Sequence, residues 1–219
     1  MRMLDLFCGR FGWSKAFAAR GWECVGVDLV EPPEIPKRCE FLEYDILELK
    51  PEYFRLDRFD FICASSPCEQ FSVHGMKHFH PNPPYPEMGI KLFNHTRSLC
   101  EATGLPYVME NVRAAQHFVG NAVNHCGPFY LWGTGVPPIM PQGINKGMTR
   151  KAMGQREYKG QPGWNTKNEA SARRLDGSGC ASIAATIPPE LSACVADYAE
   201  RLIEQANDRN GTSCGSYGR

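Results

Sequence analysis

The chain has 219 residues, of which 42% are apolar and 22% are charged, and its 24 basic and 24 acidic residues leave no formal net charge. This composition is typical of a globular protein and excludes a fibrous or low-complexity chain. No apolar run reaches the roughly 18 residues that a membrane-spanning helix needs, and the N-terminus lacks the pattern of a signal peptide. We therefore expect a cytoplasmic protein that does not enter a membrane.

The ten cysteines do not form the pattern of a disulfide-stabilised or zinc-binding protein. Most of them lie in or beside apolar segments, as reduced core thiols do. No pair has C-x-x-C spacing, and the six histidines lack zinc-ligand spacing relative to the cysteines. The cluster of His74, His78 and His80 is interpreted as solvated loop residues, with substrate contact as the alternative. We predict no metal site.

The N-terminal segment has the pattern of a nucleotide-binding βαβ unit. Apolar residues predict strands at 2–7 and 23–28, and a helical run lies between them at 14–20. The turn Cys8-Gly9-Arg10-Phe11-Gly12 lets the backbone approach a ligand, and the helix N-terminus offers free N–H groups. Asp28 is placed to accept hydrogen bonds from a ribose diol. The unit predicts an α/β protein with a mostly parallel, twisted sheet.

Two further strands are expected before residue 65. The strand at 41–45 ends in Asp45, which would lie beside Asp28 and accept from an adenine amino group. The alternative is that Asp45 is only a turn residue. The apolar run at 59–64 predicts a buried parallel strand, and Cys68 follows it at the sheet edge where α/β proteins bind ligands.

The next segment is predicted to bring a carboxylate to the Cys68 loop. Residues 73–88 have no periodicity and are expected to form a long loop, which is then followed by a helix at 87–103. A buried strand at 105–109 runs into Glu110, which would face the Cys68 loop from a neighbouring strand. Farther on, His125 to Gly133 is expected to add a strand or hairpin to the same sheet.

The last third of the chain contains a basic segment and a final helix. Residues 141–175 hold eight basic and only two acidic residues, which is typical of a segment that tracks phosphates and equally of a solvated loop. A final helix is predicted at 188–205, with Leu191, Val195, Tyr198 and Leu202 as the apolar stripe that docks on the sheet domain.

Three motifs of the first half resemble the cytosine-C5 DNA methyltransferases. They are Asp5-Leu6-Phe7-Cys8-Gly9, Ser66-Pro67-Cys68 with Phe71-Ser72, and Glu110-Asn111-Val112, and they occur in that family's order. The segment Ile187-Pro188-Pro189-Glu190-Leu191 is similar to the ending of short phage-type members. The resemblance implies a Rossmann-like S-adenosylmethionine-dependent methyltransferase fold with a reduced target-recognition region. It also implies a role in DNA methylation or restriction-modification, in the cytoplasm of a bacterium or a phage-infected cell.

The family's chemistry gives a role to each residue of the second and third motifs. The resemblance implies that the Cys68 thiolate adds to C6 of cytosine, while Glu110 holds the N3/N4 edge of the base. Pro67 would shape the loop, and Asn111 would hold the glutamate strand in place. The methyl group would come from S-adenosylmethionine. The target cytosine must be flipped out of double-stranded DNA to reach the site.

The remaining assignments also follow from the resemblance. The residues expected to contact S-adenosylmethionine are Asp5, Phe7, Cys8, Gly9, Gly12, Asp28, Leu29, Asp45 and Ser66. The residues expected to contact DNA are Ser72, Arg113, Lys146, Arg150, Lys151, Arg156, Arg173 and Arg174. The expected regions are a catalytic and cofactor-binding domain at 1–136, a small basic recognition region at 137–187, a docked helix at 188–206 and a disordered tail at 207–219.

The chain departs from the family pattern at several positions. Arg10 and Phe11 stand where the family has small residues and a second glycine. Arg10 is interpreted as a surface residue, with selection of a modified S-adenosyl donor as the alternative. Glu69 replaces the usual glutamine, and the family's Gln-Arg-Arg segment is not recognisable.

Other functions remain open at this point. The same chemistry would serve an RNA substrate or a modified donor. A non-catalytic DNA-binding or decoy protein on the same fold is a second alternative, motivated by the reduced recognition region. A thiol enzyme using Cys63 and Cys68 is a third, although the strand-to-loop spacing of these two residues disfavours a disulfide.

Overall fold

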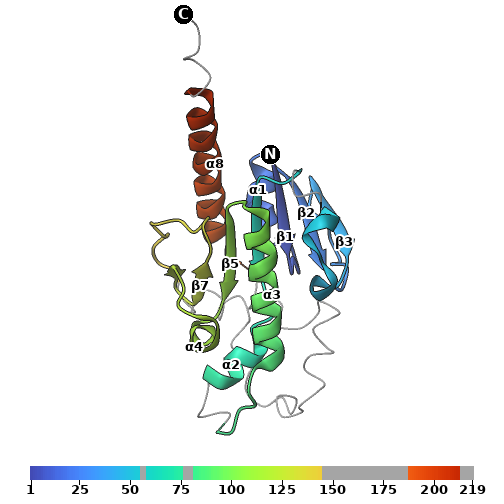
Figure 1. Cartoon of the computed structure of the whole chain (residues 1–219), viewed down its shortest axis with the longest axis vertical. Helices are drawn as coiled ribbons and strands as arrows, with labels where there is room; N and C mark the ends of the chain where they lie inside the picture. The colour runs from blue at the N-terminus through green and yellow to red at the C-terminus, as the bar shows by residue number, and fades with distance from the viewer. Residues whose placement is uncertain (55–57, 76–80, 145–186, 213–219) are drawn as a thin grey trace, which may run out of the picture.

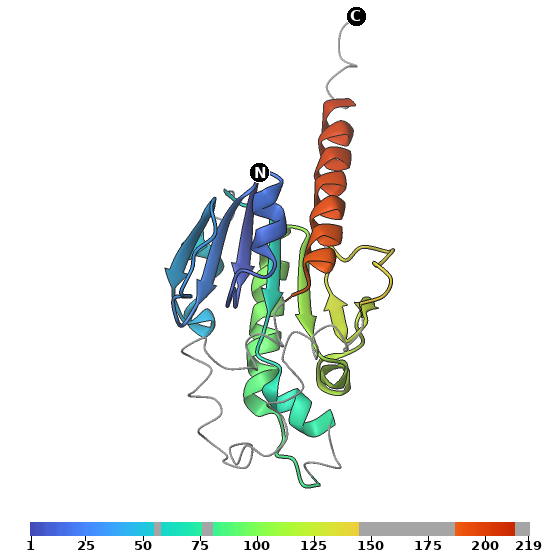
Figure 2. The ribbon, with the colours of Figure 1, turned by 180° about the vertical axis from the view of Figure 1, so that it is seen from behind.

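The computed structural model of the chain describes residues 1–54, 58–75, 81–144 and 187–212. These residues form a seven-stranded sheet in the order β3-β2-β1-β4-β5-β7-β6, in which only β7 runs against the others. Helix α3 covers one face of the sheet, and α1 with the first part of α8 covers the other (Figures 1 and 2). This arrangement confirms the predicted α/β fold with a mostly parallel sheet.

The elements have the following bounds. The strands are β1 Arg2–Leu6, β2 Glu23–Asp28, β3 Cys39–Glu43, β4 Phe61–Ser65, β5 Tyr107–Asn111, β6 Asn124–Cys126 and β7 Phe129–Trp132. The helices are α1 Ser14–Ala19, α2 Glu69–Gly75, α3 Glu87–Thr103, α4 Gln116–Val119 and α8 Pro189–Thr212. Short 3-10 turns are η1 Ile46–Glu48, η2 Pro51–Phe54 and η4 Arg113–Ala115.

The sheet separates two apolar cores. Successive residues of a strand point to opposite faces. In β1, Met3 therefore joins the core under α1 and α8, whereas Leu4 and Leu6 join the core under α3. All three are at most 1% exposed, so β1 is buried on both faces, as a central parallel strand should be.

Three predicted strands are shifted by one or two residues. Strand β3 ends at Glu43 rather than at Asp45, because the Asp45 side chain accepts a hydrogen bond from Leu47 N (2.9 Å) and begins η1 instead. Strands β4 and β5 begin and end later than predicted. Helix α3 ends at Gly104 in the left-handed conformation (φ 70°), and the turn that follows delays β5. Glu110 consequently lies within β5.

The expected loop at 73–88 is partly wrong. Its first three residues belong to helix α2, which buries Phe71 and whose Gln70 Oε1 accepts a hydrogen bond from Gly89 N of α3 (2.7 Å). Residues 76–80 lie outside the described part of the chain. The helix at 87–103 and the hairpin within 125–133 are both confirmed.

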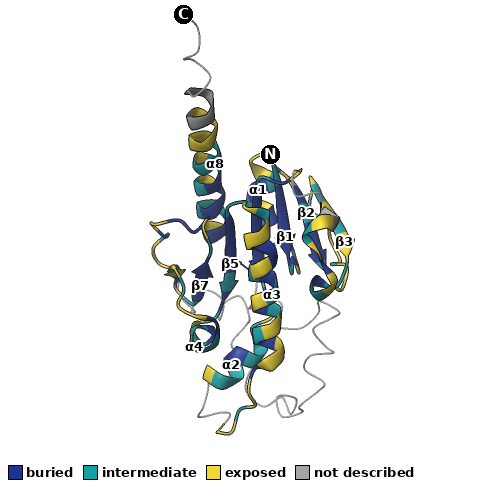
Figure 3. Ribbon diagram, in the orientation of Figure 1, coloured by how far each residue is buried: buried dark blue, intermediate teal, exposed yellow. Residues whose placement is uncertain are grey.

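Helix α8 packs on α1 through a face that differs from the predicted stripe. Leu191 and Val195 are fully buried as expected, but Tyr198 and Leu202 are only half-buried (Figure 3). Ala196 and Ala199 are the other buried apolar residues of this face. Small side chains allow two helices to approach closely. A search for large apolar residues at helical spacing does not identify such alanines as the residues that contact α1. The helix is therefore rotated relative to the prediction.

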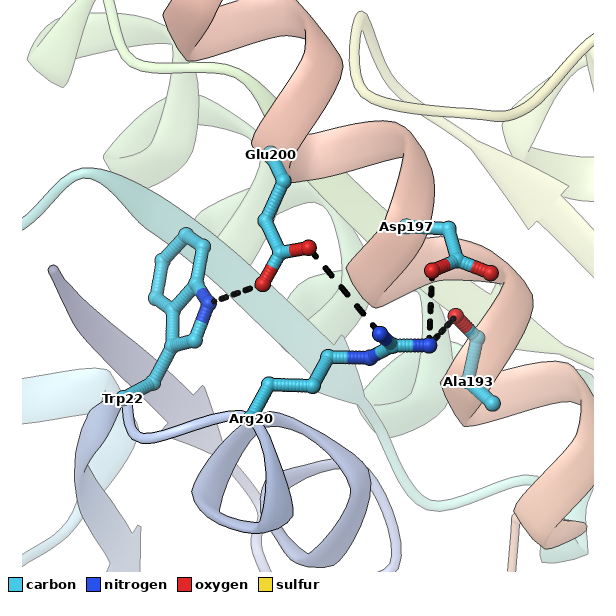
Figure 4. Close-up of polar contacts among 5 residues, drawn as sticks. All are labelled: Arg20, Trp22, Ala193, Asp197 and Glu200. Carbon is cyan, nitrogen blue, oxygen red and sulfur yellow. Dashed lines mark hydrogen bonds and ion pairs between the residues drawn. The ribbon is translucent and has the colours of Figure 1, made fainter.

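Polar contacts join α8 to the turn after α1 (Figure 4). The Arg20 guanidinium pairs with the Asp197 carboxylate (2.7 Å) and also lies 3.9 Å from that of Glu200. Trp22 Nε1 donates to Glu200 Oε1 (3.0 Å), and Arg20 also donates to the Ala193 carbonyl (3.5 Å). These contacts fix the rotation of α8 about its own axis.

The disordered tail predicted at 207–219 is wrong for 207–212, which belong to helix α8, and residues 213–219 lie outside the described part of the chain. Helix α8 continues to Thr212, and its C-terminal part extends beyond the body of the domain (Figure 1). A helix that is already nucleated by packing adds further residues at little cost, even when they include asparagine and aspartate. No helix within the described residues has both the length and the apolarity to cross a membrane.

Because α8 lies close to α1, a larger side chain should destabilise the protein at a buried position of α8 but not at an exposed one. Ala199→Leu should lower the free energy of unfolding by about 1–3 kcal/mol, because Ala199 is fully buried. The matched control Ala206→Leu lies on an exposed part of the same helix and should change it by less than about 0.5 kcal/mol. Urea denaturation followed by circular dichroism measures both values. Equal values for the two variants would contradict this packing.

Candidate functional site

The candidate site lies along the edge where the parallel strands end. In open α/β sheets, ligands bind beyond the carboxyl ends of the strands. Strand β1 ends here in the turn at 7–12, β2 ends in Asp28, β4 leads to Cys68, and β5 carries Glu110. The order β2-β1-β4-β5 makes these strand ends consecutive neighbours.

The Asp28 carboxylate is held by two backbone amides. Gly9 N donates to Asp28 Oδ2 (2.9 Å), and Leu29 N donates to Asp28 Oδ1 (2.8 Å). Burial raises the pKa of Asp28, while both hydrogen bonds act to lower it. Each carboxylate oxygen keeps a further lone pair that can accept from a ligand. Leu29 itself is exposed at this edge.

Asp5 lies beneath the turn and is fully buried. Its Oδ2 accepts from Ser14 Oγ (2.6 Å) and from Ser14 N (3.2 Å), which joins the start of α1 to β1. Burial raises the pKa of Asp5 to about 7, and the bonds from Ser14 oppose that rise. Asp5 therefore positions the turn from below.

One of the two departures in the turn, Phe11, has a structural explanation. Phe7 and Phe11 both have positive φ values (58° and 59°), in the region that glycine adopts most readily. The Phe11 ring is fully buried, and a Cβ built on Gly26 would collide with this ring and with the Cys8 thiol. The missing side chain at Gly26 thus makes the space that Phe11 fills.

A buried amide ties the Cys68 loop to β5. Asn111 Nδ2 donates to both the carbonyl oxygen and Oγ of Ser66, each at 3.0 Å. Ser66 and Asn111 are both buried, whereas Pro67 is exposed and Cys68 is half-buried. The Cys68 carbonyl accepts from Ser72 N (2.8 Å) at the start of α2. The loop is thus held at Ser66 and again at the backbone of Cys68.

Glu110 is positioned by its pairing with β4. It lies opposite Ser65 in the parallel register of β4 and β5, where the Ser65 hydroxyl acts to lower the pKa of the Glu110 carboxyl group. Glu110 is half-buried, and desolvation of its carboxyl group raises its pKa to about 7. Trp13 Nε1 in turn donates to Ser65 Oγ (2.9 Å).

The other predicted residues are placed as follows. Asp45 lies at the same edge as Asp28, because β3 pairs with β2 and Asp45 follows its end. Gly12 packs against Ile187, which a Cβ at Gly12 would approach to 3.0 Å. Arg113 is exposed on η4, which packs beside α2. The predicted DNA contacts that lie outside the described residues are Lys146, Arg150, Lys151, Arg156, Arg173 and Arg174.

Sequence reasoning missed two residues of the site, Ser65 and Trp13. Ser65 could have been found, because it ends the apolar strand next to the one that carries Glu110. Trp13 gives no such signal, since it reaches Ser65 from 52 residues away in the chain. Within the described residues, no group of three His, Cys, Asp or Glu side chains is arranged to hold a metal ion.

A family model described as C-5 cytosine-specific DNA methylase matches residues 1–125, which is more than half of the chain. The chain belongs to the C-5 cytosine-specific DNA methylase family. This result confirms the resemblance found in the sequence motifs. C5 methylases use S-adenosylmethionine as their methyl donor.

Solved structures of low identity are also similar to this C5 methylase chain. One is a mutant of DNMT2 from Spodoptera frugiperda, with 19% identity and a TM-score of 0.34, covering 53% of this chain and 37% of that one. Another is 1,6-didemethyltoxoflavin-N1-methyltransferase from Burkholderia thailandensis, crystallised with S-adenosylhomocysteine. It has 20% identity and a TM-score of 0.31, and the match covers 61% of this chain and 54% of that one. A search of curated proteins found no match.

The C5 methylase chain has a strand edge that fits this methyl donor. Gly9 is exposed, and no described atom lies within 4 Å of a Cβ built on it, so a ligand can approach the backbone. The Asp28 carboxylate retains acceptor capacity beside it, as a ribose diol requires. Phe7 is partly exposed at the start of the same turn.

The raised pKa of Glu110 predicts a pH-dependent loss of stability in this C5 methylase. The pKa of Glu110 is about 7 in the folded protein, whereas the ordinary pKa of a glutamate is 4.5. The folded state therefore keeps this proton at pH values where the unfolded chain has lost it. The resulting stabilisation is fully present below pH 4.5 and is lost as the pH rises from 4.5 to about 7. Relative to Glu110→Gln, the wild type should lose up to about 3 kcal/mol over that range.

Urea denaturation at several pH values measures this difference. Asp5 titrates in both proteins and therefore cancels in the comparison. The matched control Glu204→Gln, at an exposed position of α8, should follow the wild type at every pH. A constant difference between the wild type and Glu110→Gln across the range would contradict the raised pKa.

Proposed function

We propose that this protein is a DNA (cytosine-5-)-methyltransferase that acts through a covalent bond between Cys68 and C6 of the base. The observation that carries the proposal is the pairing of β4 with β5, which sets the Cys68 loop beside Glu110. The Asn111–Ser66 hydrogen bonds hold the two together. Both groups lie on the same strand edge as the turn at Gly9 and Asp28.

Cys68 acts as the nucleophile in this proposal. Its thiolate adds to C6 of cytosine, and the ring electron pair moves toward N3. The addition makes C5 nucleophilic, which the unmodified aromatic ring is not. After C5 has been methylated, a base removes its proton, the bond between C6 and the sulfur breaks, and the Cys68 thiolate is regenerated. Pro67 limits the backbone freedom of the loop that carries the thiolate.

Glu110 acts on the opposite edge of the base. A carboxyl group with a pKa of about 7 is partly protonated at neutral pH, so it can donate a proton to N3 as the thiolate adds to C6. Its second oxygen can accept from the N4 amino group. The proton on N3 returns to Glu110 when the thiolate leaves.

The β1–β2 end of the edge holds the methyl donor. When bound, S-adenosylmethionine supplies an electrophilic methyl group on a sulfonium ion. Asp28 would accept from its ribose hydroxyls, and Asp45 would face its adenine. The other residues proposed to line its binding site are Phe7, Cys8, Gly9, Gly12, Leu29 and Ser66, and the buried Asp5 would support the turn from below.

Double-stranded DNA with a flipped-out cytosine is the proposed substrate. Ser72 on α2 and exposed Arg113 on η4 lie next to the Cys68 loop, because α2 packs against η4. Arg113 is placed to meet a phosphate at this point. The excess of basic residues at 141–175, which lies mostly outside the described residues, would supply the other phosphate contacts.

The thiol-enzyme alternative is disfavoured by the surroundings of Cys63. This residue is fully buried within β4, and burial raises the pKa of its thiol far above the ordinary value. A thiolate at Cys63 would therefore be costly to form. The RNA substrate, the modified donor and the decoy function use the same strand edge, and the following experiment separates them from the proposal.

The covalent step can be trapped with 5-fluorocytosine, whose C5 fluorine cannot be removed as a proton is. With duplex DNA containing this base and S-adenosylmethionine, the protein should form an adduct that survives denaturing electrophoresis. Cys68→Ala should abolish the adduct, because the C6–S bond cannot form. The control Cys194→Ala removes a half-buried thiol on α8 and should form the adduct as the wild type does.

A parallel reaction uses RNA of the same sequence. An adduct on RNA alone would overturn the DNA substrate, and an adduct that persists in Cys68→Ala would overturn the nucleophile. Cofactor binding without any adduct would favour the decoy function or a modified donor.

A further inference from the structure

We propose that Ser65 and Trp13 are positioning residues that fix which oxygen of the Glu110 carboxyl group carries its proton. The inference rests on the proposed function, in which that proton moves to N3 of the base. It assigns a role to two residues that lie outside the motifs of the family resemblance.

The three side chains form a chain of neighbouring polar groups. Ser65 and Glu110 lie opposite each other on adjacent parallel strands, so their side chains leave the same face of the sheet. Trp13 approaches this face from the start of α1 and places its Nε1 at 2.9 Å from Ser65 Oγ. The chain therefore runs from Trp13 through Ser65 to Glu110.

The direction of each bond is fixed by chemistry. An indole N–H is a donor only, and a serine hydroxyl has a single proton. Ser65 Oγ must accept from Trp13, so its own proton is available for Glu110. The carboxyl oxygen that meets Ser65 is consequently an acceptor. When Glu110 is protonated, its proton lies on the other oxygen, which is then the donor to the base.

The Trp13 ring is well placed to hold this orientation. It is 1% exposed, and the Trp13 carbonyl accepts a bond of 2.6 Å from Ser192 Oγ of α8. Since Ser192 is itself fully buried, α8 fixes the backbone from which the indole reaches Ser65. The packing of α8 thus helps to position Trp13 at the site.

Other titratable groups of the described residues lie near Glu110 and Ser65. Asp5 on β1 and Cys63 on β4 share the same face of the sheet, since they are paired in register, and Cys68 follows the end of β4. Burial raises the pKa of Glu110, and the Ser65 hydroxyl acts to lower it. Removal of this hydroxyl should therefore raise the pKa further.

The test is a carbon-13 NMR titration of the Glu110 carboxyl in the whole protein, with the signal assigned by its loss in Glu110→Gln. Ser65→Ala should raise the midpoint by about one pH unit, since it removes a hydrogen bond to a charged group. Ser65→Thr keeps the hydroxyl and should restore the wild-type midpoint. The control Ser98→Ala removes an exposed hydroxyl on α3 and should leave the midpoint unchanged.

Trp13→Phe keeps an aromatic ring but removes the N–H donor. It should raise the midpoint by less than Ser65→Ala does, because the Ser65 hydroxyl remains but can rotate. In the Ser65→Ala background it should add nothing, because both changes act through the same hydroxyl. An unchanged midpoint in Ser65→Ala, or additive shifts in the double variant, would overturn the proposal.

The pH profile of methyl transfer separates this inference from the proposed function. If Glu110 donates the proton, the alkaline limb of kcat should move upward with the NMR midpoint in Ser65→Ala. A midpoint that moves while the kinetic limb does not would leave the hydrogen-bond chain intact and contradict the acid role of Glu110. A midpoint that stays while the wild type methylates DNA would contradict the positioning role alone.

Discussion

The site depends on the parallel pairing of β4 with β5. This pairing brings the end of one strand, where Cys68 begins its loop, next to the end of the other, where Glu110 lies. The Asn111 amide completes the junction by donating twice to Ser66. A buried amide that loses its acceptors is costly, so the loop cannot move from β5 without breaking favourable contacts. The pairing therefore holds Cys68 and Glu110 beside each other at one edge of the sheet.

The sequence predicted the parts of the site that depend on local pattern. Asp28 and Glu110 each follow or end an apolar strand, and parallel strands bring such ends to one edge. The pattern of apolar and polar residues could not predict contacts between residues that are far apart in the sequence. Trp13 reaches Ser65 only because α1 lies on the face to which Ser65 points. Likewise, the rotation of α8 is set by Ala196, Ala199 and the Arg20 contacts, which an apolar stripe does not reveal.

The turn at 7–12 illustrates how a departure from a family pattern can be accommodated. Phe11 takes a backbone conformation that favours glycine, and its ring fills space beside Gly26. A strained backbone costs of order 1–3 kcal/mol, whereas burial of a phenylalanine ring contributes a similar amount in the opposite direction. The turn therefore keeps its shape with a large residue where the pattern has a small one. A comparison of motifs alone would wrongly suggest that Phe11 disrupts the turn.

The residues on either side of the segment 145–186 have a consequence for how the protein could diversify. Ile144 and Ile187 are both buried in the core under α1 and α8, and close contacts at Gly127 and Gly12 hold them there. The two ends of the segment are thus fixed by the core of the sheet domain itself. The free energy of closing a loop changes only slowly with its length. Segments of different length and charge could therefore be exchanged between these two anchor points while the strand edge stays unchanged, and under the proposed function such an exchange would change the target preference.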